Sequence, residues 1–372
     1  MRMMTMVKTN VTIMRGGTSK GVFFHESAMP NNKNEWEPFL LDVMGSPDKR
    51  QIDGLGGGNS LTSKVAIIKK AYTSDIDVHY TFGQVSISEE KVDFKGNCGN
   101  ISAAVGPFAI EEGLVKATEP MTAVRILNTN TNKMIIAEVE VEDGQVKYDG
   151  DVTISGVPGS GSPIYLNFHD AAGSVTGHLL PTGNSSEFLD TSQGQIEVSI
   201  IDYANPLVFV EASSIGLDGT ELAEEFTDLQ LAQFEELRSI AAEKCGFASR
   251  FSATKLSPAV PKLAIVAKPE KYKDSTGAWH SSVEMDLHIR MMSMQKPHQA
   301  LAVTGAICTT RALSVEGAIP ARIAKNHSTK VRLAHSSGII ETMVEPTGIK
   351  IVRTARRIMD GTVYTHGDYQ MM

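Results

Sequence analysis

The feature that most constrains the fold is an internal duplication, in which the two halves of the chain repeat one order of segments. The offset of about two hundred residues is too long for a solenoid repeat, so each half should fold as its own lobe. The matched pairs, in chain order, are VTIMRGGTSKGVFF with VSIIDYANPLVFV, FLLDVMG with LRSIAAEKCG, SKVAIIKK with PKLAIVAK, DVHYTFGQVS with DLHIRMMSM, GNCGNISAAVGPFAIEEGLV with ALAVTGAICTTRALSVEGAIP, and VRILNTNTNKMIIAEVEV with VRLAHSSGIIETMVEP.

Chain length supports this division. The chain has 372 residues, which exceeds the roughly 250 to 300 residues at which a single hydrophobic core stops growing. Pro, Gly, Asn and Ser cluster in LLPTGNSSEFLDTSQGQ, which favours a loop there. We therefore predict lobes over residues 1–184 and 185–372. The tail from Arg353 either stays in the second lobe or returns to the first.

The segment patterns predict an α+β fold. Most strand-like segments are joined by short connections, which favours antiparallel sheets. The helices expected near Cys98 and Thr304 are apolar nearly all round, and a helix that is apolar on every side is buried. We expect two pseudo-symmetric lobes, each a curved, mostly antiparallel, barrel-like β-sheet wrapped around a central α-helix.

Composition excludes several classes of partner. The net charge of -8 and the isoelectric point near 5.7 disfavour nucleic acid and anionic membranes, because no basic run would release phosphate counterions. No stretch approaches the roughly 18 apolar residues of a membrane span, and the first residues do not resemble a secretory signal. Three cysteines, an odd number, argue against a disulfide framework. We therefore expect a cytoplasmic protein.

The cleft between two duplicated lobes is the expected ligand site. The buried helices begin in GNCGN and VTG, and helix N-termini offer unpaired N–H groups and the positive end of the dipole. Two such ends facing one cleft would hold two carboxylates, although glycine and asparagine also serve simply to shape turns. The residues assigned to these two ends are Asn97, Gly99, Asn100, Thr304 and Gly305.

Lys64 is the expected base. It follows the loop GLGGGNSLTS and precedes the apolar run VAII, so its amine should start at the rim of the core. Burial would lower the pKa of that amine and allow proton abstraction near neutral pH. The alternative is a surface lysine at a strand edge. Asn59, Ser60 and Ser63 of the same loop are expected to contact the ligand.

Cys98 and His298 are the other candidates for proton transfer. Cys98 lies among glycine and asparagine residues at a helix start, an environment that lowers the pKa of a thiol. Cys245 and Cys308 lie in apolar helical stretches and should be buried small hydrophobes. His298 precedes the second buried helix roughly where Cys98 precedes the first, as an acid or base or as a solvated loop histidine.

Further polar candidates occupy turns. Ser19 in RGGTSKG and Asn205 in DYANP fall in equivalent turns of the two halves, where each either donates to a carboxylate or caps the turn. Thr18 is included beside Ser19. Ser336 and Gly338 in AHSSG are weaker candidates for closing the second carboxylate site.

No cofactor motif is present in the sequence. GGGNSLTSK lacks the G-K-[ST] ending of a phosphate-binding loop, and GLGGGN lacks the third glycine of a dinucleotide motif. No His, Cys and Asp cluster has metal-ligand spacing, and no G-x-S-x-G elbow occurs. We predict no metal and no organic cofactor.

Six motifs together resemble those of the PrpF-type isomerases, a family that includes isomerases of methylaconitate, aconitate and 3-methylitaconate and the 4-oxalomesaconate tautomerase. The resemblance runs from Thr12 to Val363. It implies the two-lobed fold of diaminopimelate epimerase and cofactor-independent proton transfer on an unsaturated di- or tricarboxylic acid. It places the family's lysine, cysteine, serine and histidine on Lys64, Cys98, Ser19 and His298. The six motifs are MRGGTSKGVFF, GLGGGNSLTSKVAI, GNCGN, LLPTGN, VTGAICT and VRTARRIMDGTV.

The expected reaction begins when neutral Lys64 removes an allylic proton. The charge then spreads onto a carboxylate that helix N–H groups, Ser19 and Asn59 would stabilise. Either Cys98 or His298 returns a proton at the other end and moves the double bond, or Lys64 returns it after rotation and changes cis to trans. The leading substrates are aconitate and 2-methylaconitate. Since residues 58–61 depart from the methylaconitate branch, 4-oxalomesaconate and 3-methylitaconate are the alternatives.

Two other functions compete with this hypothesis. A two-base amino-acid epimerase needs a matched cysteine pair, whereas Ala302 aligns with Cys98, which counts against it. A non-catalytic partner of a dehydratase would keep the fold and bind carboxylates without the chemistry. The expected ligand in either case is small, and for the isomerase it is a polycarboxylate. The sequence leaves homodimer formation open.

Overall fold

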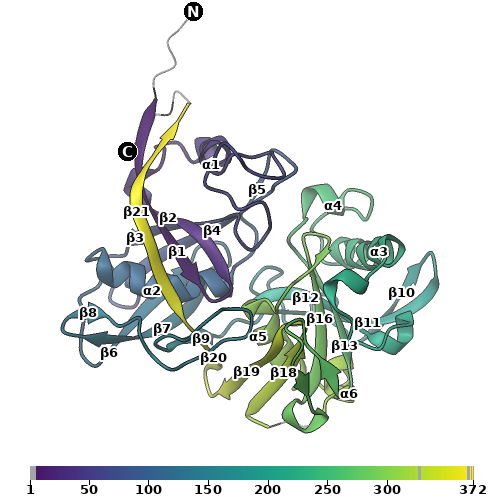
Figure 1. The fold of residues 1–372 in the computed structure, drawn as a ribbon. Helices are drawn as coiled ribbons and strands as arrows, with labels where there is room; N and C mark the ends of the chain where they lie inside the picture. Colours follow the sequence, from purple (N-terminus) through teal and green to yellow (C-terminus); the bar gives the residue numbers. More distant parts are fainter. Residues whose placement is uncertain (1–5, 326–327, 367–368, 370, 372) are drawn as a thin grey trace, which may run out of the picture.

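The computed structural model describes residues 6–325, 328–366, 369 and 371. Figure 1 shows two lobes, one built from the N-terminal half and the last strand, the other from most of the second half. Both combine curved, mostly antiparallel sheets with few helices, so the predicted α+β class and duplicated architecture are confirmed. Within the described residues, no helix has both the length and the apolar character needed to cross a bilayer.

The first lobe wraps its sheet around helix α2 (Gly99–Glu111), which is buried from its first residue to Ile110. Helix α1 (Trp36–Met44) packs on the outer face. It ends at Gly45, whose φ of 68° favours glycine. The strands of this lobe are β1 (Val7–Gly16), β2 (Ser19–His25), β3 (Lys64–Lys70), β4 (Val78–Val85), β5 (Val92–Asp93), β6 (Met121–Asn128), β7 (Lys133–Glu142), β8 (Gln145–Val146), β9 (Ile164–His169) and β21 (Ala355–Thr365).

The second lobe repeats this plan. Helix α5 (Val303–Ala312) lies inside the sheet, and α3 (Asp228–Lys244) covers the outer face. The short helices α4 (Ala253–Leu256) and α6 (Ile319–Ile323) complete the lobe. Its strands are β10 (Glu187–Thr191), β11 (Gly194–Tyr203), β12 (Asn205–Glu211), β13 (Lys262–Ala267), β16 (Leu287–Ser293), β17 (Lys296–Pro297), β18 (Lys330–His335), β19 (Gly338–Glu345) and the separate hairpin β14 (Tyr272–Lys273) and β15 (Trp279–His280). Single 3-10 turns are η1 (Glu26–Ala28), η2 (Lys33–Glu35), η3 (Ala212–Ile215), η4 (Ala223–Glu225) and η5 (Ser282–Glu284).

Strands β3 and β13 are buried on both faces, which explains their unbroken apolar runs. Side chains alternate along a strand. Val65 and Ile67 therefore pack under α1, while Ala66 and Ile68 join the inner core around α2. In β13, Leu263 and Ile265 pack under α3, and Ala264 and Val266 face the inner core. Each strand begins with a lysine, Lys64 in β3 and Lys262 in β13. By the same alternation, both lysines lie on the inner face of the sheet, where the buried helices pack.

Parallel pairing occurs where a helix separates the two strands. β2 pairs in parallel with β3 across α1, and β12 with β13 across α3. β4 with β6 and β16 with β18 are likewise parallel, and the buried helices α2 and α5 lie in their connections. Each lobe thus contains two helical crossovers within an otherwise antiparallel sheet.

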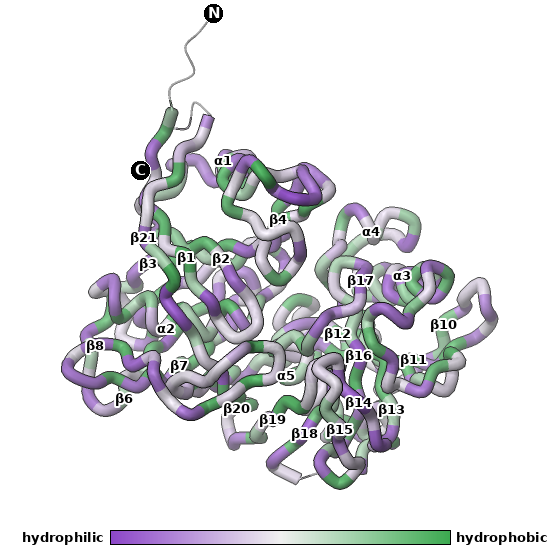
Figure 2. Tube along the Cα trace, viewed as in Figure 1, coloured by the Kyte–Doolittle hydropathy of each residue, from purple (hydrophilic) through white to green (hydrophobic). Residues whose placement is uncertain are grey.

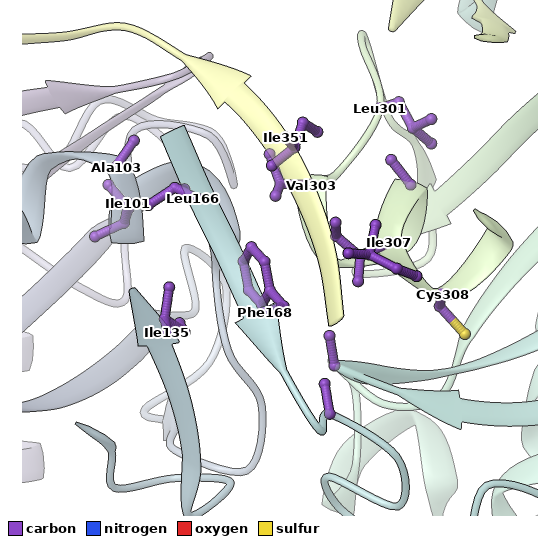
Figure 3. Packing of buried hydrophobic residues seen from close by; sticks show 14 of the residues in the cluster. Ile101, Ala103, Ile135, Leu166, Phe168, Leu301, Val303, Ile307, Cys308 and Ile351 are labelled. Carbon is purple, nitrogen blue, oxygen red and sulfur yellow. The ribbon is translucent and has the colours of Figure 1, made fainter. Parts of the chain in front are cut away.

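The two lobes share one continuous sheet. Strand β20 (Gly348–Arg353) pairs with β19 of the second lobe and with β9 of the first, and β21 pairs with β1 along its length. The tail therefore returns to the first lobe. Figure 3 shows Ile101 and Phe168 on one side of Ile351, and Val303 and Ile307 on the other, so the core passes through β20 from lobe to lobe. Hydrophilic stretches lie outside, for example around β6 and β8 (Figure 2).

Candidate active site

A cavity between the lobes gathers polar side chains from both halves. Its inner part has a volume of about 40 Å³. Gln84, Asp93 and His298 line this part and also an outer part of about 580 Å³ that opens to solvent. The inner part is thus a small chamber at the base of a wide mouth, and its other lining residues include Ser19, Lys64, Asn97, Cys98, Gly99, Asn100, Asn205, Lys262, Ser293, Ala302, Val303 and Thr304.

Lys64 lies at the wall of the inner chamber, where its side chain is held by the neighbouring strand. Lys64 is only 7% exposed, and its Nζ donates to Oε1 of Gln84, its partner in the β3–β4 ladder. The Gln84 amide is oriented in turn, because Nε2 donates to the carbonyl of Ser63 over 3.0 Å. Burial lowers the pKa of Lys64, an effect that a thiolate at Cys98 would oppose. The lowered pKa favours the neutral amine, which is the form that can accept a proton.

Cys98 precedes α2 and occupies the N-cap position with extended backbone. The next residue, Gly99, lies against the first residue of α5, since a Cβ atom built on Gly99 would be 2.4 Å from Cγ1 of Val303. The N-termini of the two buried helices therefore meet at the chamber, as the duplication predicted. Asn97 and Asn100 on one side and Thr304 on the other line it with them. A developing negative charge here would face two positive helix ends.

His298 is neutral near physiological pH. Burial, with the charge of Lys64 as a smaller cause, lowers its pKa to about 4. Its Nδ1 accepts a hydrogen bond from the backbone N–H of Ala300 over 3.1 Å, which places the ring proton on Nε2. His298 is thus suited to donate a hydrogen bond to a bound oxyanion. The low pKa makes it a poor source of the second proton.

Ser19 and Asn205 are buried in the two equivalent turns, each with an unsatisfied polar atom. The preceding turns bend sharply, with φ of 50° at Gly17 and 61° at Ala204. Oγ of Ser19 and Oδ1 of Asn205 are buried, and neither has a hydrogen-bond partner in the described chain. Because buried polar atoms are nearly always paired, both atoms are candidates to contact a ligand.

The loop before Lys64 contributes to the outer part of the cavity. Asn59 and Ser60 line the mouth. Ser63, in contrast, is fully buried, and its Oγ lies 2.7 Å from both Oε1 of Gln51 and the carbonyl of Asn59. Ser63 therefore holds the loop in shape instead of lining the cavity.

Four other predicted ligand residues lie outside the inner chamber. Thr18 lines a separate cavity behind the Ser19 turn. Gly305 permits close packing, because a Cβ there would be 2.2 Å from Cε of Met291.

Ser336 and Gly338 belong to the β18–β19 hairpin. Oγ of Ser336 donates to the carbonyl of Gln299 over 2.9 Å, and the carbonyl of Gly338 accepts from the Tyr272 hydroxyl over 2.7 Å. Ser336 therefore supports the loop that carries His298, whereas Gly338 anchors Tyr272.

Sequence reasoning missed two charged residues of the inner chamber, Lys262 and Asp93. The duplication had aligned Lys262 with Lys64, and that signal pointed to a second inward lysine. Nζ of Lys262 donates to the carbonyl of Ala259 over 2.8 Å. Burial, and then the charge of Lys64, lower its pKa to about 8, while Asp93 and Cys98 act in the opposite direction. Asp93 itself is 4% exposed, and its Oδ2 has no partner among the described residues.

The remaining cysteines are not part of this chamber. All three cysteines are free. Cys308 is buried in α5, and Cys245 packs against the cluster under α3. Burial raises the pKa of both thiols, to about 12 for Cys245. Across the described residues, no three His, Cys, Asp or Glu side chains are grouped to hold a metal ion.

Known proteins resemble this chain over nearly its whole length. Residues 6–366 match the PrpF protein family. A 3-methylitaconate isomerase of Eubacterium barkeri is 47% identical over 364 residues, which cover 95% of this chain and 96% of that protein. A 4-oxalomesaconate tautomerase of Pseudomonas putida is 39% identical and covers 94% of both chains. The crystal structure of a methylitaconate-delta-isomerase is similar with a TM-score of 0.80 at 46% identity, and it covers 97% of this chain and 96% of its own.

Proposed function

The chain belongs to the PrpF protein family, and from this premise we propose that it is an isomerase that moves the double bond of a small unsaturated di- or tricarboxylic acid. The observation that carries the proposal is a single buried chamber that contains an amine with a lowered pKa, a thiol and two converging helix N-termini. This set of groups suits proton removal from carbon, proton return, and stabilisation of the intermediate anion.

In the proposed reaction, neutral Lys64 takes a proton from the carbon next to the double bond. The C–H electron pair moves into the conjugated system and onto a carboxylate, giving a dienolate. The Cys98 thiol then delivers its proton to the far carbon, and the double bond is displaced by one position. Lys64 is left as ammonium and Cys98 as thiolate, and a proton passed between them, directly or through solvent, restores both. The geometry supports this division because both side chains line one chamber.

Charge balance gives Lys262 a role that the sequence alone did not indicate. A dicarboxylate brings two negative charges, and the dienolate concentrates further charge on one carboxylate. With a pKa of about 8, Lys262 is mostly protonated at neutral pH and would hold a carboxylate. Its positive charge also favours the neutral form of Lys64. The two equivalent lysines of the duplication thus take different roles, one as base and one as counter-ion.

The shape of the cavity separates the reacting atoms from the rest of the substrate. The inner chamber, at about 40 Å³, is much smaller than the mouth, at about 580 Å³. Only the reacting part of the acid would fit there, and a remaining carboxylate would extend toward Asn59 and Ser60 at the mouth. The 47% identity to a 3-methylitaconate isomerase supports an acid of the itaconate type ahead of an oxalomesaconate.

The proposal also covers the cofactor requirement, the cellular location and the assembly of the protein. No step of the proposed reaction requires a cofactor. A cytoplasmic location would keep the Cys98 thiol reduced, as the proton-donor role requires. A homodimer is proposed as the assembly, and light scattering on the purified chain tests it.

Proton NMR in D₂O tests the proposed function. The chain is incubated with 3-methylitaconate, itaconate, trans-aconitate and oxalomesaconate in parallel. An isomerase converts at least one acid, with loss of its vinyl or allylic signals and incorporation of deuterium. A carboxylate-binding protein without catalysis would broaden or shift signals and leave every acid unconverted, and that result would refute the proposal. Lys64→Ala should abolish the conversion, whereas Lys69→Ala, at an exposed position of the same strand, should not.

A further inference from the structure

A second cavity lies behind the turn that carries Ser19. Its volume is about 290 Å³, just below the roughly 300 to 1,000 Å³ of sites for drug-sized ligands, so it suits a smaller ligand. Thr18 of the β1–β2 turn, His335 at the end of β18 and Arg353 at the end of β20 all line it. These elements belong to the first lobe, the second lobe and the strand that joins them. The cavity therefore lies at the junction of the lobes.

Arg353 carries a buried charge without a counter-ion. It is 5% exposed, and in the described part of the chain no carboxylate comes within ion-pair distance of its guanidinium. Nη1 donates to the carbonyl of Val352 over 2.7 Å, but Nε is buried without a partner. Burial lowers the pKa of Arg353 to about 9, so the group remains charged at neutral pH. An unpaired buried charge is costly, which indicates that an anion completes the site.

His335 and Thr18 add two further donors without acceptors. Nδ1 of His335 accepts from the N–H of Ser337 over 3.2 Å, which places the ring proton on Nε2. Burial, together with the charges of Arg290 and Arg353, holds the pKa of His335 well below its usual value, so the ring is a neutral donor. No described residue accepts from Nε2, and the buried Oγ1 of Thr18 also has no partner.

The carboxylates nearest the cavity are engaged elsewhere. Glu341 lines it but pairs with Lys330 over 2.7 Å. Lys350 at the rim pairs with Glu138 over 2.7 Å. Ser155 donates to a backbone carbonyl of β19 over 3.2 Å. The unsatisfied groups identified among the described residues can all donate hydrogen bonds, and Arg353 is charged, so the cavity favours an acceptor with negative charge.

We propose that Thr18, His335 and Arg353 form a binding site for a small oxyanion, a carboxylate or a phosphate, that is separate from the reaction chamber. Arg353 supplies the charge, and His335 and Thr18 donate hydrogen bonds to the remaining oxygens. The site is distinct because Thr18 and Ser19, adjacent in the turn, line different cavities. Because its three donors come from both lobes and the connecting strand, a bound anion stabilises the junction.

The turn connects the two sites physically. The N–H of Gly17 donates to the carbonyl of Thr354 over 2.9 Å, next to Arg353. The N–H of Thr18 donates to Oδ1 of Asn100 over 3.3 Å, and Asn100 lines the reaction chamber. An anion at Arg353 therefore holds the turn that places Ser19.

Thermal unfolding and titration calorimetry with inorganic phosphate and with succinate test the site, with sodium chloride at matched ionic strength as reference. The wild-type chain should bind one of these anions and unfold at a higher temperature in its presence. Arg353→Met should weaken binding at this site by roughly 10-fold or more and should remove the part of the thermal shift that persists in Lys262→Met. Tighter binding of phosphate would identify the ligand as a phosphate, and tighter binding of succinate would identify it as a carboxylate.

Three variants separate this site from the reaction chamber and from a structural role. Succinate can also occupy the reaction chamber, so the response assigned to the Arg353 site is the part that Lys64→Ala and Lys262→Met retain, because these lysines lie in the other cavity. Without anion, Arg353→Met should unfold at the wild-type temperature or above, since it removes an unpaired charge; a purely structural arginine would give a lower temperature. If Arg353→Met fails to fold, Thr18→Val provides the test and should weaken binding several-fold. An unchanged anion response in Arg353→Met, or in Thr18→Val, would overturn the proposal, as would a wild-type chain that responds to neither anion.

Discussion

Gly99 and Val303, the first residues of the two buried helices, are in direct contact across the lobes. A Cβ atom on Gly99 would lie 2.4 Å from Cγ1 and 2.7 Å from Cβ of Val303. Real Cβ atoms do not approach that closely, so any side chain here must push the helices apart. The absence of a side chain at residue 99 thus sets the distance between the two positive helix ends.

Replacing Gly99 tests this contact. Gly99→Ala should lower kcat/KM by about 10- to 100-fold, because a displacement of about 1 Å at a preorganised site has effects of that size. Steady-state kinetics on the substrate found by NMR provides the measurement. The double variant Gly99→Ala with Val303→Gly removes both Cγ1 and Cβ of residue 303, the two atoms within 3 Å, and should recover most of the activity. Failure of the second substitution to rescue the first would show that the helix spacing is not the cause.

Lys262 should control the protonation of Lys64. Removing its positive charge raises the pKa of Lys64, and the base is active only when neutral. In Lys262→Met, the acidic limb of the kcat profile should therefore move to higher pH, and KM should rise because a carboxylate loses its counter-ion. Lys262→Arg keeps the charge and should keep the limb near its wild-type position. A profile unchanged in Lys262→Met would contradict the coupling.

His298 should contribute a hydrogen bond without appearing in the pH profile. Its pKa of about 4 lies below the range in which the enzyme would be assayed, so no ionisation of His298 should show between pH 6 and pH 9. His298→Gln, which retains a donor, should lose less activity than His298→Ala, for which we expect a loss of roughly 10- to 1000-fold. Steady-state kinetics of both variants across this pH range provides the measurement. A limb of the pH profile that shifts or disappears in either variant would show that His298 ionises in this range.

Buried neutral histidines predict a loss of stability in acid. His288 and His298 have pKa values of about 4 in the folded chain, against about 6.5 when unfolded. The unfolded state therefore takes up more protons as the pH falls, and the free energy of unfolding decreases from about pH 6.5 down to about pH 4. The loss is at most about 3 kcal/mol per histidine. Urea unfolding at pH 7 and pH 5 measures this loss. His288→Gln should reduce the change in the free energy of unfolding between the two pH values, whereas His178→Gln, at an exposed position, should not.

Much of the fold could be predicted because the chain carries it twice. The duplication defined the lobes and the matched helices, and it placed Ser19 opposite Asn205 and Lys64 opposite Lys262. The burial of Lys64 could be predicted because this lysine directly precedes the apolar run VAII. The same reasoning passed over Lys262 because the residues just before it, SATKLSPAVP, lack the glycine cluster that drew attention to Lys64.

Other features depend on tertiary contacts that no local pattern reveals. The return of the tail rests on β20 pairing with β9 and β19 at once, and edge pairing of that kind has no sequence signature. Ser63 looked like a ligand residue by its neighbours, but its hydroxyl turns inward to Gln51. Arg353 lies in VRTARRIMDGTV, one of the six motifs shared with the family. That its guanidinium lacks a counter-ion can be seen only in the folded chain, where the two lobes meet.

Deuterium exchange by the Cys98→Ala variant tests the central claim most directly, namely that Lys64 removes a carbon-bound proton and Cys98 supplies one at the other end. With 3-methylitaconate in D₂O, or the acid that the NMR panel identifies, Cys98→Ala should still exchange the allylic hydrogen while the double bond stays in place. Lys64→Ala should do neither. Isomerisation by Cys98→Ala at a rate near that of the wild type, or allylic exchange by Lys64→Ala, would contradict the account.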